Sequence, residues 1–199
     1  MKSISPRITF LGIFALFVGP LLLAWLMYAG QVDFEPDETR NKGNLVEPPL
    51  PLPVERSATG ADDPWQSSLL NHWVVLYPIS SPCGASCIEQ VTGLRQLHRA
   101  SGRDQPRIRI ALLQSSSADQ LLESRLKEIY PQFVLVRDTD NLLHEALAQA
   151  SQQVGVKSDV FLVDPLGNVM MSYPETEMLN HLKSDLKQLL KWSKQDQGS

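Results

Sequence analysis

The chain has 199 residues and a mass of 22.2 kDa, which allows one ordinary domain with an appendage but not two full-sized domains. Hydrophobic residues make up 43% and charged residues 20% of it, a balance that excludes a chain disordered throughout. With a net charge of −4 and no cluster of Lys and Arg interleaved with aromatic residues, a nucleic-acid partner is not expected. Two cysteines are too few for a disulfide-dense scaffold or a four-thiolate zinc site.

The N-terminal apolar stretch covers residues 8–30 and contains no charged side chain. At about 1.5 Å rise per residue, a helix over this stretch would cross a hydrocarbon core of roughly 30 Å, so we predict a transmembrane anchor. A cleaved signal peptide is the alternative, but Ala29-Gly30-Gln31 is a poor match to a cleavage site. Lys2 and Arg7 precede the stretch, and acidic residues follow it. Because basic flanks stay on the cytoplasmic side, we expect residues 1–7 inside and the C-terminal bulk outside.

Residues 31–64 are acidic and rich in proline, and they show neither helical nor strand periodicity. Proline-rich segments favour extended conformations, so we predict a semi-rigid linker here, or a strap along the following domain. A ligand for a proline-recognition module is the sharper alternative. The linker leaves residues 65–199 for the folded domain.

Strands and helices alternate along the rest of the chain. The expected strands are continuous runs of apolar, β-branched and aromatic residues at 73–77, 107–113, 133–136, 160–163 and 169–173. The expected helices have apolar residues three and four positions apart, within 88–101, 122–129, 143–150 and 178–190. Thr139 or Asp140 could cap the third of these helices.

The last two strands flank Asp164-Pro165-Leu166-Gly167-Asn168, whose Pro and Gly are typical of a hairpin loop. Residues 73–191 therefore have the order βαβαβαββα. That order matches the thioredoxin-like architecture of the α/β class, in which helices cover both faces of a central sheet. Here one transmembrane helix would precede it.

Cys83 and Cys87 lie between the first strand of this domain and its first helix, which places Cys87 at or near a helix N-terminus. The unpaired N–H groups there favour the thiolate, which is the reactive and metal-binding form of cysteine. Three intervening residues allow the sulfurs to close a disulfide or to chelate a soft cation such as Cu(I). A purely structural clamp is the alternative, but so short a loop removes little entropy from the unfolded chain.

The other candidate ligands carry weaker signals. His72 precedes the first strand of the domain, and His98, His144 and His181 lie on helices, where histidines usually serve packing or the surface. Met170 and Met171 could offer a thioether to copper, although one of two neighbours in a strand must face the core. None of these residues is assigned a role.

The chain resembles the Sco/SenC branch of thioredoxin-like proteins, which are membrane-anchored copper-handling factors for cytochrome c oxidase. The similarity covers the element order of residues 73–191 and rests locally on the anchor, the Cys83/Cys87 spacing and the strand and turn at 161–167. The chain is still more similar to small single-span proteins encoded with bacterial cytochrome c oxidase genes. Those proteins carry an Asn-x-Gly-x-Leu-Val-x-Pro-Pro-like segment after the anchor, here Asn41 to Pro49.

The chain also departs from the Sco pattern. Counting back from Gly167, Val156 stands at the position of the histidine that completes the copper site of Sco proteins, with Lys157 adjacent. Ile88 replaces the proline that usually follows the second cysteine, and no proline precedes the late strand, as it does in thioredoxin-type oxidoreductases. We therefore expect at most weak Cu(I) binding through Cys83 and Cys87.

These observations together predict a single-pass protein of the bacterial inner membrane with its thioredoxin-like domain in the periplasm. The resemblance implies an assembly factor for cytochrome c oxidase, with an oxidase subunit or another assembly factor as partner. Cys83 and Cys87 would exchange electrons with partner thiols or hold Cu(I) transiently. A general thiol–disulfide oxidoreductase and a non-catalytic membrane scaffold are the two alternatives.

Overall fold

The computed structural model describes residues 6–28, 41–54, 68–79, 82–115, 120–174 and 178–193. Contacts divide the chain into two compact units, Met1–Arg40 and Asn41–Ser199. The predicted cytoplasmic N-terminus lies mostly outside the described residues, as do residues 31–40 and 55–64 of the predicted linker.

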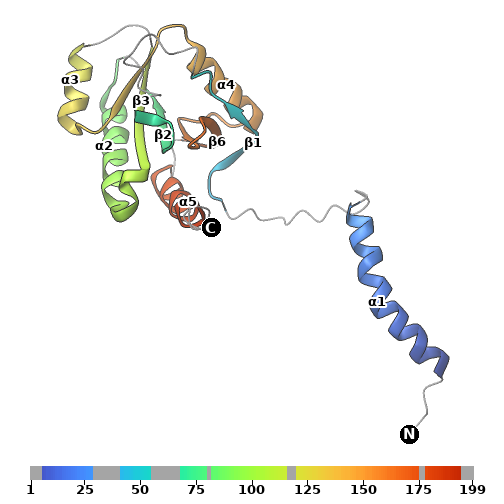
Figure 1. Ribbon diagram of the computed structural model, residues 1–199. Coiled ribbons are helices and arrows are strands. Elements are labelled where there is room, and N and C mark those ends of the chain that lie inside the picture. The colour runs from blue at the N-terminus through green and yellow to red at the C-terminus, as the bar shows by residue number, and fades with distance from the viewer. Residues whose placement is uncertain are drawn as a thin grey trace. The chain divides into compact units, whose positions relative to one another are not determined.

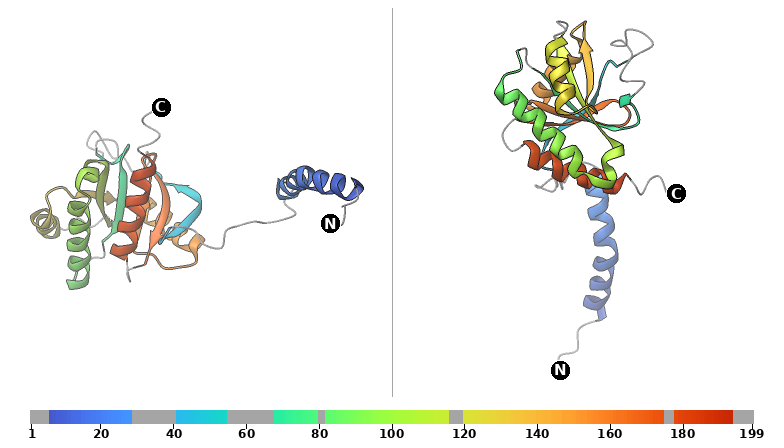
Figure 2. Two further views of the ribbon diagram at one scale, coloured as in Figure 1. Left: turned by 90° about the horizontal axis from the view of Figure 1, so that it is seen from below. Right: turned by 90° about the vertical axis from the view of Figure 1, so that its left-hand side faces the viewer.

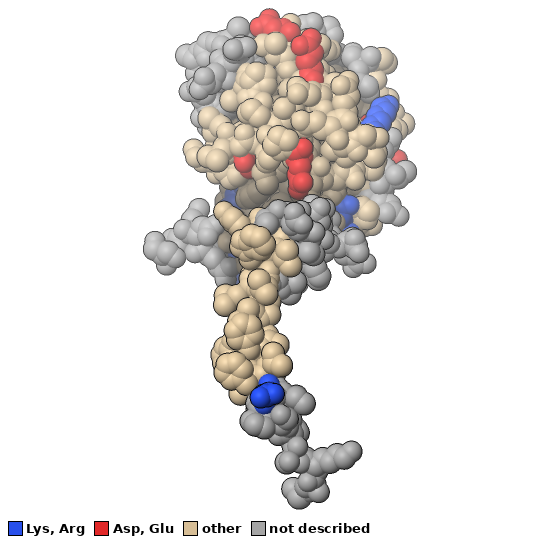
Figure 3. Space-filling model, turned by 90° about the vertical axis from the view of Figure 1, so that its right-hand side faces the viewer, with Lys and Arg blue, Asp and Glu red and all other residues tan. Residues whose placement is uncertain are grey.

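The first unit contains one helix, α1 (Pro6–Tyr28), of 23 residues with Pro20 inside it. Large apolar side chains are exposed along its length: Phe10, Leu11, Ile13, Phe14, Leu16, Phe17, Leu21, Leu22, Trp25 and Tyr28. In Figure 3 the surface of α1 is formed almost entirely by uncharged residues. Counted over the described residues, no helix offers a stretch long and apolar enough to cross a membrane.

The second unit is built on a six-stranded sheet with the strand order β1-β6-β5-β2-β3-β4 (Figure 1). The strands are β1 (Asn44–Pro51), β2 (Trp73–Pro78), β3 (Ile108–Ser115), β4 (Val134–Asp138), β5 (Val160–Val163) and β6 (Asn168–Tyr173). The helices are α2 (Ala85–Ala100), α3 (Gln120–Ile129), α4 (Leu142–Val154) and α5 (Met178–Trp192), with a 3₁₀ helix, η2, at Gly102–Arg107. The order predicted for residues 73–191 is confirmed.

The sheet lies between two helical layers, with α2, α3 and α5 on one face and α4 on the other (Figure 2). Successive residues of a strand point to opposite faces, so β3 supplies both cores. Ile108, Ile110 and Leu112 pack in the core under α2, whereas Ala111 and Leu113 pack toward α4. Burial on both faces explains why the central strands are continuous apolar runs.

The sheet mixes strand directions, and this determines what lies beside the cysteine loop. β2, β3 and β4 are parallel, whereas β5 runs antiparallel to β2 and to β6. The predicted hairpin is confirmed, with Asp164 accepting hydrogen bonds from the N–H groups of Leu166 and Asn168 at 2.9 and 2.8 Å. The N-terminal end of β5 therefore lies next to the C-terminal end of β2.

The structure differs from the sequence prediction at β1. This strand pairs antiparallel with the edge of β6, from Asn44 opposite Ser172 to Pro51 opposite Asn168. Proline is tolerated at a sheet edge, because the outward side of an edge strand needs no N–H donor. Val46 and Leu52 are buried in the core on the α4 side. For these eight residues the structure agrees with the predicted strap along the domain rather than with the spacer, and it adds a strand that was not predicted.

A buried carboxylate holds the chain where it enters β1. Asp185 of α5 is 2% exposed and accepts hydrogen bonds from the backbone N–H groups of Lys42 at 2.9 Å and Gly43 at 2.8 Å. The hydroxyl of Tyr173 donates to the same carboxylate at 3.1 Å. Burial, followed by the charge and hydrogen bond of Asp185, raises the pKa of Tyr173, so this hydroxyl remains a donor. We call residues 41–51 the strap.

The start of α4 also differs from the prediction. Neither Thr139 nor Asp140 caps it; the N-cap residue is Asn141, in the left-handed region at φ 62°. Asp138, at the end of β4, accepts hydrogen bonds from the N–H groups of Leu143 at 3.2 Å and His144 at 2.8 Å. The capping carboxylate therefore comes from the preceding strand.

Candidate functional site

Cys83 and Cys87 are joined by a disulfide, with their Cα atoms 5.3 Å apart. The loop that they close follows β2 and runs into the first turn of α2, whose N-cap residue is Gly84. Cys83 is half-buried and Cys87 is buried, whereas the residues between them, 84–86, are exposed. Cys83 is therefore the more accessible of the two sulfurs.

The first turn of α2 bears on the chemistry of Cys87. Cys87 is the third residue of a 16-residue helix that has no acidic residue in its first turn and no side-chain cap. The partial positive charge of a helix N-terminus stabilises a thiolate on such a residue. Cys87 is thus suited to leave as a thiolate when the disulfide is attacked.

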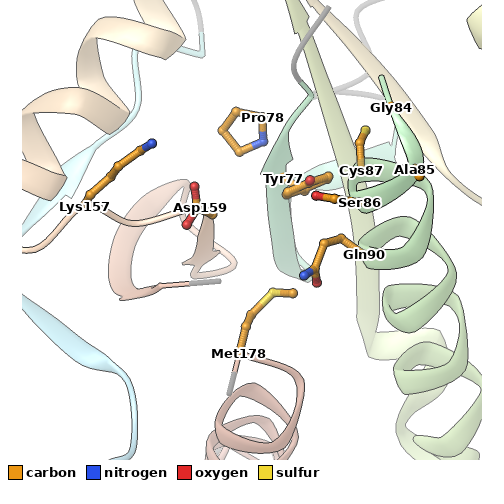
Figure 4. Close-up of a pocket in the computed structure, with 10 residues that line it drawn as sticks. All are labelled: Tyr77, Pro78, Gly84, Ala85, Ser86, Cys87, Gln90, Lys157, Asp159 and Met178. Atoms are coloured by element: carbon orange, nitrogen blue, oxygen red, sulfur yellow. The ribbon is translucent and has the colours of Figure 1, made fainter. Parts of the chain in front are cut away.

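A pocket of about 380 Å³ opens beside the disulfide. It is lined by the end of β2 (Tyr77, Pro78), the start of α2 (Gly84, Ala85, Ser86, Cys87, Gln90), the segment before β5 (Lys157, Asp159) and the first residue of α5 (Met178). Figure 4 shows Lys157 and Asp159 on the side of the pocket opposite α2. Segments distant in sequence therefore meet beside Cys87.

The sheet register explains why Lys157 and Asp159 reach this place. Phe161 of β5 is paired with Leu76 of β2, so residues just before β5 lie beside residues just after β2. The backbone N–H of Asp159 also donates to the carbonyl of Tyr173 at 2.9 Å, which fixes the segment against β6. Sequence reasoning did not assign these two residues to the site, although the predicted antiparallel hairpin was the signal that could have found them.

The position matched to the Sco histidine, Val156, lies outside the pocket. Val156 is 42% exposed and does not line the pocket, whereas Lys157 and Asp159 do. Counting residues back from the turn gave a position outside the pocket. A side chain intended to reach the cysteines should therefore be placed at 157 or 159.

The four histidines lie elsewhere. His72 precedes β2, at the opposite end of that strand from the cysteine loop, and its Nδ1 is 2.9 Å from the carbonyl of Leu70. His144 contacts Asp138 through its Nδ1 at 2.6 Å, and His181 lies on α5. None lines the pocket, and within the described ranges no three His, Cys, Asp or Glu side chains are grouped as a metal site would require.

His98 is a buried structural histidine. Its Nδ1 lies 2.8 Å from the hydroxyl of Tyr130, and its Nε2 lies 3.1 Å from the carbonyl of Ile108. Burial lowers the pKa of His98, and the nearby charge of Arg109 acts in the same direction, against hydrogen bonds to the backbone of Ile108 and Gln105 that raise it. The imidazole therefore favours its neutral form and joins α2 to β3.

The methionines beside the hairpin pack as expected for strand residues. Met171 is buried in the core under α2, and Met170 is partly buried against the same core. The methionine that reaches the pocket is Met178, at the start of α5, which is 2% exposed. No local pattern in the sequence indicates this position, because it depends on how α5 crosses the sheet.

The chain is similar to solved structures of Sco proteins and of thiol-disulfide oxidoreductases. Sco1 from Thermus thermophilus has a TM-score of 0.53 at 16% identity, covering 77% of this chain and 99% of its own. The chain is also similar to a copper-bound ScoI from Arabidopsis thaliana, with a TM-score of 0.47 at 14% identity, covering 65% of this chain and 89% of that one. A thiol-disulfide oxidoreductase from Bacteroides fragilis has a TM-score of 0.45 at 18% identity, covering 74% of this chain and 99% of its own. The Thermus match confirms the thioredoxin-like fold.

Models of protein families match both parts of the chain, whereas no curated protein matches it. Residues 7–31 match a transmembrane-like N-terminal domain. Residues 73–193, more than half of the sequence, match a transmembrane-like, thioredoxin-like C-terminal domain. The chain therefore belongs to the family of transmembrane-like proteins with a thioredoxin-like C-terminal domain.

Proposed function

We propose that this protein is a membrane-anchored thiol–disulfide exchange factor whose reactive pair is Cys83 and Cys87. The observation that carries the proposal is a disulfide closed across the first turn of α2, with the adjoining residues exposed and a pocket beside it. A purely structural bridge needs neither the helix start nor the pocket.

The exchange proceeds in two steps. A partner thiolate attacks Sγ of Cys83, the more accessible sulfur; a mixed disulfide forms, and Cys87 leaves as a thiolate. A second partner thiolate then attacks the partner's own sulfur in the mixed disulfide, which releases Cys83 as a thiolate. The partner loses two electrons and gains a disulfide, while the protein gains two thiols, whose protons come from the partner thiols through solvent. The reverse sequence reduces a partner disulfide.

The reversibility of the Cys83–Cys87 bond tests this chemistry. We expect alkylation of free thiols, across a series of glutathione redox buffers, to show a single two-electron transition under native conditions. A bond that stays oxidised until the domain is denatured would contradict the exchange function and favour the structural clamp. A Cys83→Ser/Cys87→Ser double variant that retains full function in cells would favour the scaffold.

The proposed client is a copper-site dithiol of cytochrome c oxidase or of one of its assembly factors, as the resemblance to Sco/SenC proteins implies. A trapping experiment tests this client directly. In a Cys87→Ser variant, the Cys83 thiolate should attack the disulfide form of this client and release one client thiolate; the mixed disulfide then persists, because the resolving thiol is missing. A Cys83→Ser variant is the matched control. Adducts that contain no oxidase component would support the general oxidoreductase instead.

The anchor is proposed from the exposed apolar side chains along α1 and from the transmembrane-like match over residues 7–31. A helix that is apolar on all sides needs an apolar environment. Because Lys2 and Arg7 precede the stretch, we propose that the domain lies on the periplasmic side of a bacterial inner membrane. Protease added to outer-membrane-permeabilised cells should then remove residues 65–199; full protection would contradict the orientation.

Copper handling is a second candidate function, favoured by the fold shared with Sco1. A reduced pair offers two thiolates, but the facing wall of the pocket offers Lys157 and Asp159 rather than a histidine. These residues do not fit a three-ligand copper site, so we expect weak Cu(I) binding and no tight Cu(II) binding.

The corrected geometry sharpens the copper test. Lys157→His places an imidazole in the pocket, whereas Val156→His places one outside it and serves as the matched control. In competition with a Cu(I) chelator, the reduced Lys157→His variant should bind at least tenfold more tightly than the reduced Val156→His variant. Equal affinities of the two variants would contradict the placement, and tight Cu(II) binding by the unmodified protein would contradict the two-thiolate account.

A further inference from the structure

We propose that Lys157 is a specificity-determining residue that makes the Cys83–Cys87 disulfide react preferentially with negatively charged thiols. The inference rests on the proposed exchange function and names the class of client that it favours. Such a client presents an acidic group beside its reacting cysteine.

The pocket beside Cys87 holds two charged side chains. Lys157 and Asp159 line the wall that faces Cys87 across the opening (Figure 4). Among the described residues that line the pocket, these two alone carry a formal charge; the remainder are Tyr77, Pro78, Gly84, Ala85, Ser86, Cys87, Gln90 and Met178. Cys83 does not itself line the pocket, but it is bonded to Cys87, which does. A thiol that attacks Cys83 therefore approaches beside the one ammonium and the one carboxylate that the described lining carries.

Exposure distinguishes the two charges. Lys157 is exposed, whereas Asp159 is half-buried and already takes part in another interaction. The backbone of Asp159 is also tied to β6 through Tyr173. The ammonium of Lys157, on a long flexible stem, is thus the charge that an approaching partner meets first.

Electrostatics predicts the consequence. A charge in a pocket changes the rate of encounter with a charged ligand by about tenfold or more at low ionic strength, with opposite sign for ligands of opposite charge. Lys157 should raise the rate of encounter with a carboxylate-bearing thiol and lower the rate with an ammonium-bearing thiol. Added salt should reduce both effects, because the Debye length falls from about 30 Å at 0.01 M to roughly 3 Å at 1 M.

The inference is tested with three small thiols of similar size: 3-mercaptopropionate, 2-mercaptoethanol and cysteamine. The readout is the second-order rate constant for reducing the Cys83–Cys87 bond in the oxidised full-length protein, held in a non-ionic detergent. We use the ratio of the rate constants for the anionic and cationic thiols. This ratio cancels effects common to all thiols, such as a change in the stability of the leaving thiolate or of the fold.

Variants give the expected pattern. Lys157→Met should lower the ratio about five- to tenfold at low salt, whereas Lys157→Arg should preserve it. Lys183→Met removes an exposed lysine of α5 that does not line this pocket, so it controls for net charge and should leave the ratio unchanged. Asp159→Asn should raise the ratio, and the differences should nearly vanish at 1 M salt.

The two proposals fail in different ways. If no thiol reduces the disulfide of the unmodified protein under native conditions, the exchange function fails and the inference fails with it. If reduction proceeds but the ratio is the same in Lys157→Met as in the unmodified protein, or falls equally in Lys183→Met, the exchange function stands and the role of Lys157 is overturned.

Discussion

The strap and the cysteine loop are two short segments of this domain that differ in how tightly they are held. The strap is held by Asp185 of α5, whose buried carboxylate accepts hydrogen bonds from Lys42, Gly43 and Tyr173. In the cysteine loop, the residues between the two cysteines, 84–86, are exposed. The strap is thus fixed by a buried polar contact, whereas the loop presents its residues to solvent.

The largest effect on stability should come from removing the carboxylate that holds the strap. Asp185→Ala leaves the buried N–H of Gly43, the part-buried N–H of Lys42 and the Tyr173 hydroxyl without their acceptor, which should cost about 3–5 kcal/mol of unfolding free energy. Denaturant unfolding of the full chain in detergent measures it. Asp185→Asn, which keeps the acceptor oxygen, should cost less, and the exposed Lys187→Ala on the same helix should cost little. A loss below 1 kcal/mol in Asp185→Ala would contradict the role assigned to the strap.

One glycine in each region gives a matched comparison of packing. A Cβ at Gly43 would come within 2.3 Å of the Tyr173 ring, whereas a Cβ at Gly84 meets nothing within 4 Å. Gly43→Ala should therefore cost about 1–3 kcal/mol through overpacking, and Gly84→Ala should be nearly neutral. Thermal unfolding of both variants measures the difference. Equal losses would show that the strap is no more tightly packed than the loop.

Reducing the disulfide should have a smaller effect on stability. A loop of five residues contributes about 2 kcal/mol at most in the chain-entropy model, and less where the reduced state keeps local structure. Denaturant unfolding of the oxidised and reduced protein measures the difference, with the Cys83→Ser/Cys87→Ser variant as a control that should not respond to reductant. A loss as large as that of Asp185→Ala would indicate that the bridge has a mainly structural role.

The rest of the domain and the strap differ in how well their strands and helices could be predicted from the sequence. Residues 73–191 could be predicted because their strands are continuous apolar runs and their helices carry apolar residues at regular spacing. A strap along the domain was one of the predicted alternatives, but the strand within it could not be predicted, because Glu47 and the prolines at 48, 49 and 51 hide any alternation. Its strand exists only through pairing with β6 and packing toward α4, which are contacts distant in sequence.

The candidate site was predictable in part for a related reason. Cys83 and Cys87 were found from their spacing and from their place between a strand and a helix. The residues on the side of the pocket opposite α2 were not predicted. Counting back from the turn pointed to Val156, whereas the register of β5 on β2 brings Lys157 and Asp159 into the pocket. Met178 could not be found locally, since its position depends on how α5 packs across the sheet.

The smallest expected effect on stability is at His98, which lies outside both the strap and the cysteine loop and serves as a reference for them. Burial lowers the pKa of His98 below its ordinary value of 6.5, so the unfolded chain takes up a proton on this residue more readily than the folded domain. The contribution of neutral His98 to stability is therefore fully present above about pH 6.5 and is lost as the pH falls below that value toward the folded pKa.

Unfolding free energies between pH 5 and pH 8 measure this dependence. His98→Gln keeps a polar group near Tyr130 and Ile108 but cannot titrate, so it should be less stable at pH 8 and lose less stability between pH 7 and pH 5 than the unmodified protein. His144→Gln, at the half-buried histidine beside Asp138, is the matched control at a second histidine. An unchanged pH dependence in His98→Gln would show that the stability lost in acid comes from another group.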